Sequence, residues 1–277
     1  MTPEARFCNG CGQPVAGTAG TPAAPLVAPL EYTIQGDNLQ VARVRLKPGQ
    51  EVYADAGRMV YKTANVQWDT RMTGSSLGEK LLGAFRRTIT GESLFVTYFR
   101  SDTTGEVGFA GHYPGKIQVF DLPVGKSLLA QRDAFLLAQP TVQYSVALVK
   151  KLGAGFFGGE GFILEKFTGP GTVFIHAGGD FVDFDLEQGQ MLHVDAGCIV
   201  AFDDTVDYDI QFVGGIKTAL FGGEGMFLAV LTGPGHVVVQ SMTLERLRRE
   251  IGTGRRSDGD THNALGTLGG ILGGSDE

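Results

Sequence analysis

An all-β fold built from three copies of one module is the fold class that this 277-residue sequence predicts. Three observations predict it: a long internal repeat, strand-like segments in each copy, and glycine or proline turns at short intervals. Segments 157–171 and 221–235 are identical at ten of fifteen positions, with an offset of 64 residues. Coincidence does not explain this level of identity, so we treat the repeat as real.

Two further pairs of segments extend the repeat along the chain. Segments 46–66 and 186–206 match at eight of twenty-one positions, and 104–125 resembles 168–189, again 64 residues apart. Because a repeat determines the architecture before any local pattern does, we expect a triplicated β body over residues 30–245.

The predicted strands are rich in Val, Ile, Phe and Tyr, the residues that strands favour. They include 142–149, 172–177, 180–186, 206–213 and 236–240. Glycine occurs 42 times, and we expect most of it in turns, because glycine adopts positive φ without a steric penalty. A glycine loop that binds phosphate would need a following helix, and these glycines precede strands.

Two segments predict short helices that pack on the β body. Leu77–Arg87 has apolar residues on one face, and Thr243–Ile251 begins with a threonine that can cap a helix. Residues 246–277 are predicted to be the end of the second helix and a disordered glycine-rich tail.

Composition excludes several classes of protein. Hydrophobic residues make up 43% and charged residues 19%, which is a globular balance. The net charge of −7 argues against a protein that binds nucleic acid by overall charge. No apolar run approaches the ~20 residues of a membrane span, and the N-terminus lacks the apolar core of a secretory signal. With three cysteines and no disulfide framework, we expect a cytoplasmic location.

The first twelve residues contain Phe-Cys-Asn-Gly-Cys-Gly, which looks like half of a zinc ribbon. Cys8 and Cys11 could reach one metal ion, but a closed structural zinc site needs four ligands. Zinc shared with another chain or partner domain, a relic knuckle without metal, and redox chemistry therefore stay open, the last being the least favoured. Residues 13–29 read as a flexible linker, and Cys198 is expected to be a small buried residue in a strand.

Histidines and carboxylates are the other candidate metal ligands. They are His112, His176, Asp183, Asp185, His193 and Asp195. A cupin-like metal enzyme would use a His-x-His pair, which the chain lacks. His112 and His176 occupy equivalent positions in the aligned repeats, where the third copy has Gln240, and hydrogen-bonded strand histidines are the simpler interpretation.

Three glutamates recur in the Gly-Glu links of the three copies, at Glu92, Glu160 and Glu224. A cluster of them would repel itself unless it held a cation or shared protons. Hydrogen bonding of each glutamate to turn backbone is the alternative that we favour. No Ser/His/Asp or Cys/His arrangement can be assembled, so no catalytic residue is assigned.

Four features, taken in their order and spacing, resemble a known family. They are GESLF at 91–95, the two FGGEG blocks, TGPGxVxxQ at 232–240 and LxxGxxLxVDAG at 186–197. Together they resemble the bacterial branch of the altered-inheritance-of-mitochondria type of mitochondrial-biogenesis protein. The resemblance implies tandem modules similar to the tryptophan RNA-binding attenuation protein fold, a shortened double-stranded β-helix. It also implies a compact pseudo-threefold body that assembles into trimers, and a structural role linked to membrane organisation.

The leading prediction for function is a non-enzymatic scaffold or interaction protein that forms homo-oligomers and acts near a membrane. It needs no cofactor, apart from zinc if the knuckle holds it. A small-ligand or metal-binding β-helix protein, including an enzymatic one, is the alternative. RNA binding is the third prediction and is less favoured, because the basic clusters flank the predicted helices. They are Arg86, Arg87, Arg100, Arg246, Arg248 and Arg249.

Overall fold

The structure is a computed structural model that describes residues 28–55, 57–72, 95–150, 162–213 and 226–253. Most of these residues lie in antiparallel β-strands, and the one α-helix among them is α3 (Leu244–Thr253). The predicted all-β fold is confirmed. The helix predicted at Leu77–Arg87 lies outside the described residues.

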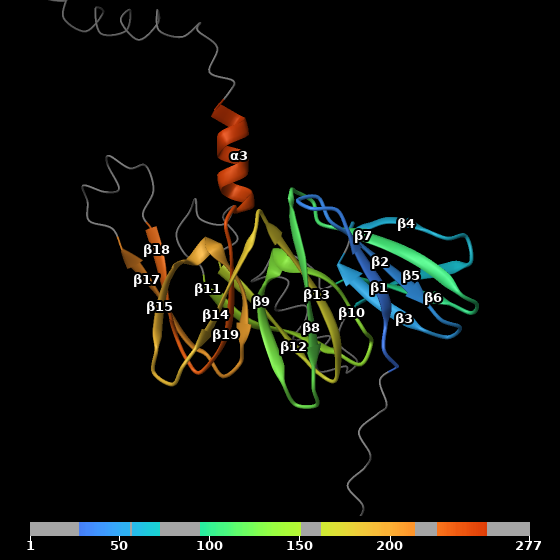
Figure 1. Cartoon of the computed structure of the whole chain (residues 1–277), viewed down its shortest axis with the longest axis horizontal. Helices are drawn as coiled ribbons and strands as arrows, with labels where there is room; N and C mark the ends of the chain where they lie inside the picture. The colour runs from blue at the N-terminus through green and yellow to red at the C-terminus, as the bar shows by residue number, and fades with distance from the viewer. Residues whose placement is uncertain (1–27, 56, 73–94, 151–161, 214–225, 254–277) are drawn as a thin grey trace, which may run out of the picture.

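Three modules follow one another along the chain (Figure 1). Module 1 contains β1 (Glu31–Gln35), β2 (Val41–Leu46), β3 (Glu51–Asp55), β4 (Met59–Lys62), β5 (Val66–Met72), β6 (Phe95–Ser101) and β7 (Gly105–Ala110). Module 2 contains β8 (Gly115–Leu122), β9 (Ser127–Gln131), β10 (Phe135–Ala138), β11 (Gln143–Lys150), β12 (Phe162–Thr168) and β13 (Gly171–Gly178). Module 3 contains β14 (Phe181–Leu186), β15 (Met191–Asp195), β16 (Ile199–Asp203), β17 (Asp207–Val213), β18 (Met226–Thr232) and β19 (Gly235–Gln240).

Strand pairing confirms that the modules are copies of one unit. β2, β8 and β14 each pair with the last strand of their module, and that strand pairs in turn with β4, β10 or β16. The same β-bulge interrupts this second pairing in every module, between Met59 and Tyr61, Phe135 and Leu137, and Ile199 and Ala201. A shared bulge is a specific feature of a fold, so it supports common descent of the three modules.

Consecutive modules share their sheets. Sheet 1 has the order β1-β2-β7-β4, and sheet 2 joins β5-β6-β3 of module 1 to β10-β13-β8 of module 2. Sheet 3 joins β11-β12-β9 of module 2 to β16-β19-β14 of module 3, and sheet 4 is β15-β18-β17. The two junctions are therefore the antiparallel pairs β3·β10 and β9·β16.

Three apolar cores fill the spaces between the sheets. Core 1, which includes Phe99, Phe109 and Phe174, combines residues of sheets 1 and 2. Core 2 combines sheets 2 and 3, and core 3 combines sheets 3 and 4. All four residues of β10 are buried because the strand lies between cores 1 and 2. This explains why β10 is a continuous apolar run rather than an alternating one.

The alternating burial of side chains along β2, a strand of sheet 1, agrees with the position of core 1 on one face of that sheet. In β2, Ala42, Val44 and Leu46 are buried while Arg43 and Arg45 are exposed, as the two-residue period of a strand requires.

The C-terminal helix α3 begins where the sequence predicts it. The Oγ1 atom of Thr243 accepts a hydrogen bond of 3.1 Å from the backbone N–H of Arg246, which is the geometry of a helix N-cap.

The modules lie in a row, with module 1 at one end and module 3 at the other (Figure 1). The compact pseudo-threefold body implied by the family resemblance is therefore wrong for the single chain. A closed body would pair β4 with β15, but these strands end two separate sheets among the described residues.

Truncation of Leu137 tests the first junction. This side chain is fully buried in core 1, and its backbone pairs with Ala54 across the junction. We expect Leu137→Ala to lower the free energy of unfolding by about 2–5 kcal/mol, because it leaves a cavity. Urea unfolding measures this change. The control Val124→Ala, at an exposed position, should stay within about 0.5 kcal/mol of wild type.

Candidate functional site

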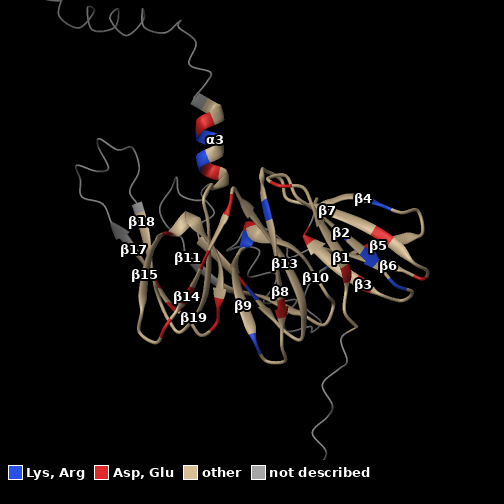
Figure 2. Ribbon diagram, viewed as in Figure 1, with Lys and Arg blue, Asp and Glu red and all other residues tan. Residues whose placement is uncertain are grey.

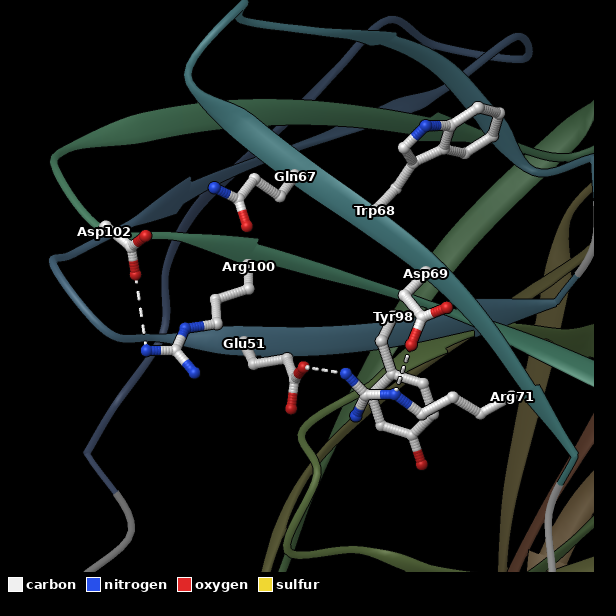
Figure 3. Close-up of a pocket in the computed structure, with 8 residues that line it drawn as sticks. All are labelled: Glu51, Gln67, Trp68, Asp69, Arg71, Tyr98, Arg100 and Asp102. Carbon is white, nitrogen blue, oxygen red and sulfur yellow. Dashed lines mark hydrogen bonds and ion pairs between the residues drawn. The ribbon is translucent and has the colours of Figure 1, made fainter.

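A hollow of about 470 Å³ lies on the face that β3, β5 and β6 present next to the first junction (Figure 3). Its lining residues are Glu51, Gln67, Trp68, Asp69, Arg71, Tyr98, Arg100 and Asp102. Figure 3 shows that the Trp68 ring points away from the other side chains. The ring stacks instead on Phe99 of core 1, with centroids 6.5 Å apart.

Arg71 is the central side chain of the hollow. Its Nε donates to Asp69 Oδ2 at 2.9 Å and its Nη2 donates to Glu51 Oε1 at 3.2 Å. The guanidinium carbon lies 4.3 Å from the centroid of the Tyr98 ring, which is a cation–π contact. Three strands thus fix one cation between two carboxylates and an aromatic ring.

The rest of the hollow is also polar. Arg100 pairs in register with Glu51 on one side and with Gln67 on the other, so the three side chains share one face of sheet 2. Arg100 Nη2 lies 3.3 Å from Asp102 Oδ1. With cations and carboxylates interleaved beside an aromatic ring, the surface can bind a polar protein or peptide segment by hydrogen bonds and ion pairs.

The sequence did not predict this hollow, and of its residues only Arg100 was singled out, as part of a basic cluster. A signal was present: Gln67, Asp69 and Arg71 alternate along one strand, which places them on a single face. The partner residues on the neighbouring strands are distant in sequence, so only the sheet register brings them together.

A buried carboxyl group lies in the middle module. Glu165 on β12 is buried, and its Oε1 accepts a hydrogen bond of 2.5 Å from the Tyr144 hydroxyl. Its Oε2 is buried without a hydrogen-bond partner. Burial raises the pKa of Glu165 to about 8, although the hydrogen bond from Tyr144 acts in the opposite direction. The equivalent residues in the other modules are Thr97 and Ala229, so this carboxyl is not part of the repeat.

Asp183 and Asp185 of β14, which were candidate metal ligands in the sequence, pair with a histidine, His236, that was not among those candidates. His236 Nδ1 lies 2.7 Å from Asp185 Oδ1, and His236 Nε2 lies 3.0 Å from Asp183 Oδ1. Burial acts to lower the pKa of His236, but the hydrogen bonds to the two carboxylates outweigh it and the pKa is raised. His193, by contrast, is exposed on β15.

His112 and His176 do not occupy equivalent positions, contrary to the sequence alignment. By strand register the equivalent of His176 is Ala110 in module 1, and Gln240 keeps its expected place in module 3. His112 lies after β7, in the turn that leads into β8. This turn is longer than the turn between β13 and β14, so an alignment at a fixed offset matches His112 with His176 although their strand positions differ.

His176 is buried against the edge of the Tyr113 ring, with centroids 5.1 Å apart. Burial, with a smaller effect of the Arg58 charge, lowers the pKa of His176 to about 4. Its ring fills the space that a side chain at Gly111 would need, so glycine is required there. His176 is therefore a neutral packing residue at neutral pH.

The remaining predicted site residues give less information. Cys8 and Cys11 lie outside the described residues, as do Glu92, Glu160 and Glu224. Cys198 is half-buried at the end of a 3₁₀ turn, not in a strand as predicted, and burial raises the pKa of its thiol. Within the described ranges, no group of three or more His, Cys, Asp or Glu side chains is placed to hold a metal ion.

None of the helices in those ranges is long and apolar enough to span a membrane.

These features define a class of protein: a triplicated all-β protein whose modules share sheets and whose polar hollow lies at the surface. The chain belongs to the mitochondrial biogenesis AIM24 family, whose family model matches residues 32–242. An uncharacterized protein of Streptococcus pyogenes serotype M6 is 33% identical over 210 residues, covering 74% of this chain and 83% of the relative. An X-ray crystal structure of a Streptococcus pyogenes protein has a TM-score of 0.64 and 28% identity, covering 81% of this chain and 99% of that one.

Replacement of the buried carboxyl group should change how stability depends on pH. Native Glu165 keeps its proton up to about pH 8, whereas the unfolded carboxyl ionises near pH 4.5. Between these values the native state binds the extra proton, so wild-type stability falls as pH rises. Glu165→Gln removes this effect, and we expect its stability relative to wild type to rise by up to about 1.4 kcal/mol per pH unit. Chemical unfolding from pH 5 to 8 measures it, and a stability difference that does not change with pH would contradict it.

Proton binding at His236 should change stability with pH in the same direction as at Glu165, because the native pKa is raised at both residues. Because its native pKa is raised above 6.5, the stabilisation is fully present below pH 6.5 and is lost as pH rises through the native value. NMR titration should give a pKa above 6.5 that decreases in Asp185→Asn. The matched control Asp180→Asn changes an aspartate that pairs with Lys116 and should leave His236 unchanged. An unshifted pKa in wild type would refute the proposed pairing.

Proposed function

We propose that this protein is a non-enzymatic scaffold or interaction protein that presents the module 1 hollow to a protein partner. One observation carries the proposal: continuous sheets join the modules around apolar cores, while the hollow lies on an exposed face. Shared sheets hold the modules in a fixed relation, as a scaffold requires. The hollow adds a binding surface of fixed geometry.

The lining of the hollow supports a protein partner over a small ligand. Its volume is within the range of small-ligand pockets, but such pockets are lined mainly by apolar side chains. Here the lining is mainly charged and forms its own ion pairs. A small-ligand or metal-binding function is thus the second candidate, and RNA binding is less favoured because three carboxylates line the hollow.

Partners and location complete the proposal. We include association into homo-oligomers, with the trimer that the family resemblance suggests, and contact with a membrane surface. A cytoplasmic location rests on composition alone. Liposome flotation of the full chain tests the membrane contact, and native mass measurement tests the oligomer.

Charge reversal in the hollow tests the interaction function. We expect Arg71→Glu to reduce capture of a protein partner from native lysate at least tenfold, because the new carboxylate repels Glu51 and Asp69. Quantitative mass spectrometry compares captures by wild type and variant. The matched control Arg248→Glu lies on the exposed surface of α3 and should capture as wild type does. Equal capture by all three proteins, with unchanged melting temperatures, would reject the hollow as the binding surface.

A further inference from the structure

The guanidinium of Arg71 is fixed in one plane by two carboxylates of the hollow. Its Nε donates to Asp69 Oδ2 at 2.9 Å and its Nη2 donates to Glu51 Oε1 at 3.2 Å. The N–H bonds of a guanidinium lie in the plane of the group, so these hydrogen bonds occupy its edges and leave its two faces uncovered. Asp69 lies on β5 and Glu51 lies on β3, with β6 between them, so the plane is held from two strands.

Tyr98 covers one face of the Arg71 guanidinium. The guanidinium carbon lies over the Tyr98 ring, 4.3 Å from its centroid. Figure 3 shows the guanidinium overlapping this ring and no other labelled side chain. The Arg71 side chain is still 49% exposed, although one face and two of its nitrogens are engaged. The second face is therefore open to the hollow.

This arrangement is not part of the repeated fold. Strand register gives the positions equivalent to Glu51, Asp69, Arg71 and Tyr98 in the other two modules. These positions hold Ser127, Ser145, Leu148 and Lys166 in module 2, and Met191, Asp209, Gln211 and Val230 in module 3. Both modules form the same strands without the arrangement, so the strands do not require it. This favours a role in recognition over a role in folding.

Charge around Arg71 restricts what its open face can bind. Lys and Arg lie beside Asp and Glu on module 1, whereas residues 180–213 of module 3 carry nine carboxylates and neither Lys nor Arg (Figure 2). A carboxylate of a partner that approached Arg71 would meet Glu51 and Asp69, and both would repel it. An uncharged aromatic ring meets no such repulsion, and the cation attracts the negative face of the ring.

We propose that the open face of Arg71 stacks on an aromatic side chain of the protein partner. This inference rests on the proposed function and names the chemistry that the hollow recognises. The ring of the partner, Arg71 and Tyr98 form a stack of three groups with the cation in the middle. Because Glu51, Asp69 and Tyr98 already hold Arg71, little side-chain entropy is lost on binding. Arginine and aromatic residues are enriched at protein interfaces and carry much of their binding energy.

A nucleobase also offers an aromatic face, but a protein side chain fits the hollow better. Nucleic acid brings phosphate groups with its bases, and proteins that bind it neutralise these phosphates with Lys and Arg. Here Glu51, Asp69 and Asp102 line the hollow and would repel the phosphates. An aromatic side chain carries no such charge.

NMR titration of the isotope-labelled full chain with small probes tests the stack. We expect N-acetyltryptophanamide to shift the Arg71 Nε–H resonance upfield in a saturable way, because the proton then lies over the face of an aromatic ring. N-acetylleucinamide has the same backbone groups but no ring, and it should leave the resonance in place. Equal shifts with both probes, or no saturable shift with N-acetyltryptophanamide, would overturn the proposal.

Arg71→Lys separates stacking from charge. Lysine keeps the positive charge but lacks the planar group, so we expect it to weaken binding of N-acetyltryptophanamide by about fivefold. Tyr98→Leu removes the ring beneath the cation and should weaken binding to a similar extent. The backbone amide of Asp69 reports binding in each variant, and melting temperatures check that each variant folds.

The matched control is Arg43→Lys. Arg43 also pairs with a carboxylate, that of Glu106, but it lies on β2 of sheet 1, so this variant should bind the probe as wild type does. An Arg71→Lys chain that binds N-acetyltryptophanamide as tightly as wild type would overturn the proposal.

Two further measurements identify the class of partner and separate this inference from the proposed function. Adenosine monophosphate should bind more weakly than N-acetyltryptophanamide, and tighter binding would overturn the assignment to a protein side chain. If Arg71→Glu loses capture of a partner but the tryptophan probe does not bind, the stack is rejected and the interaction function stands. Equal capture by wild type and Arg71→Glu would instead reject the interaction function, on which the stack depends.

Discussion

Backbone pairing across the two module junctions is the constraint on which the rest of the structure depends. The strands β10 and β16 complete a sheet with the preceding module and also contribute to the core of their own module. A one-residue slip at either junction would exchange the two faces of the strand, so the register is strongly specified. It also places Tyr53 in core 2, where it packs on Phe135.

Position in the row determines which substitutions each repeat tolerates. The position of Glu165 is occupied by Thr97 in module 1 and by Ala229 in module 3. A carboxyl group is tolerated in the buried middle module because it is held protonated and hydrogen-bonded to Tyr144. The surface pair of His236 with Asp185 is exposed to water on one side, and its hydrogen bonds raise the pKa of the histidine. Repeats that are alike in backbone therefore differ in chemistry where their surroundings differ.

The triplicated β fold could be predicted from the sequence, because segments such as FGGEG and TGPG recur at a fixed offset. Such a repeat can be recognised without knowing which residues are in contact. Sequence reasoning did not reach the candidate site, because Arg71, Glu51 and Tyr98 come together only through the pairing of β5, β6 and β3. It equated His112 with His176, because a fixed offset ignores the longer turn before β8. The compact pseudo-threefold body that the family resemblance implied is also not what the structure shows, because the number of repeats does not determine whether the last module packs against the first.

Edge strands of soluble proteins are normally protected by charged residues that discourage pairing with another chain. Several edge strands of this chain follow that rule, since β5, β8, β14 and β17 each end a sheet and carry two charged residues. By contrast, β15 reads Met-Leu-His-Val-Asp and β4 reads Met-Val-Tyr-Lys, each with a single charged residue at its last position. The edge strands β1 and β11 also carry one charged residue each, so charge alone does not set β4 and β15 apart. What distinguishes β4 and β15 is that their equivalents in the other modules are paired across the two junctions.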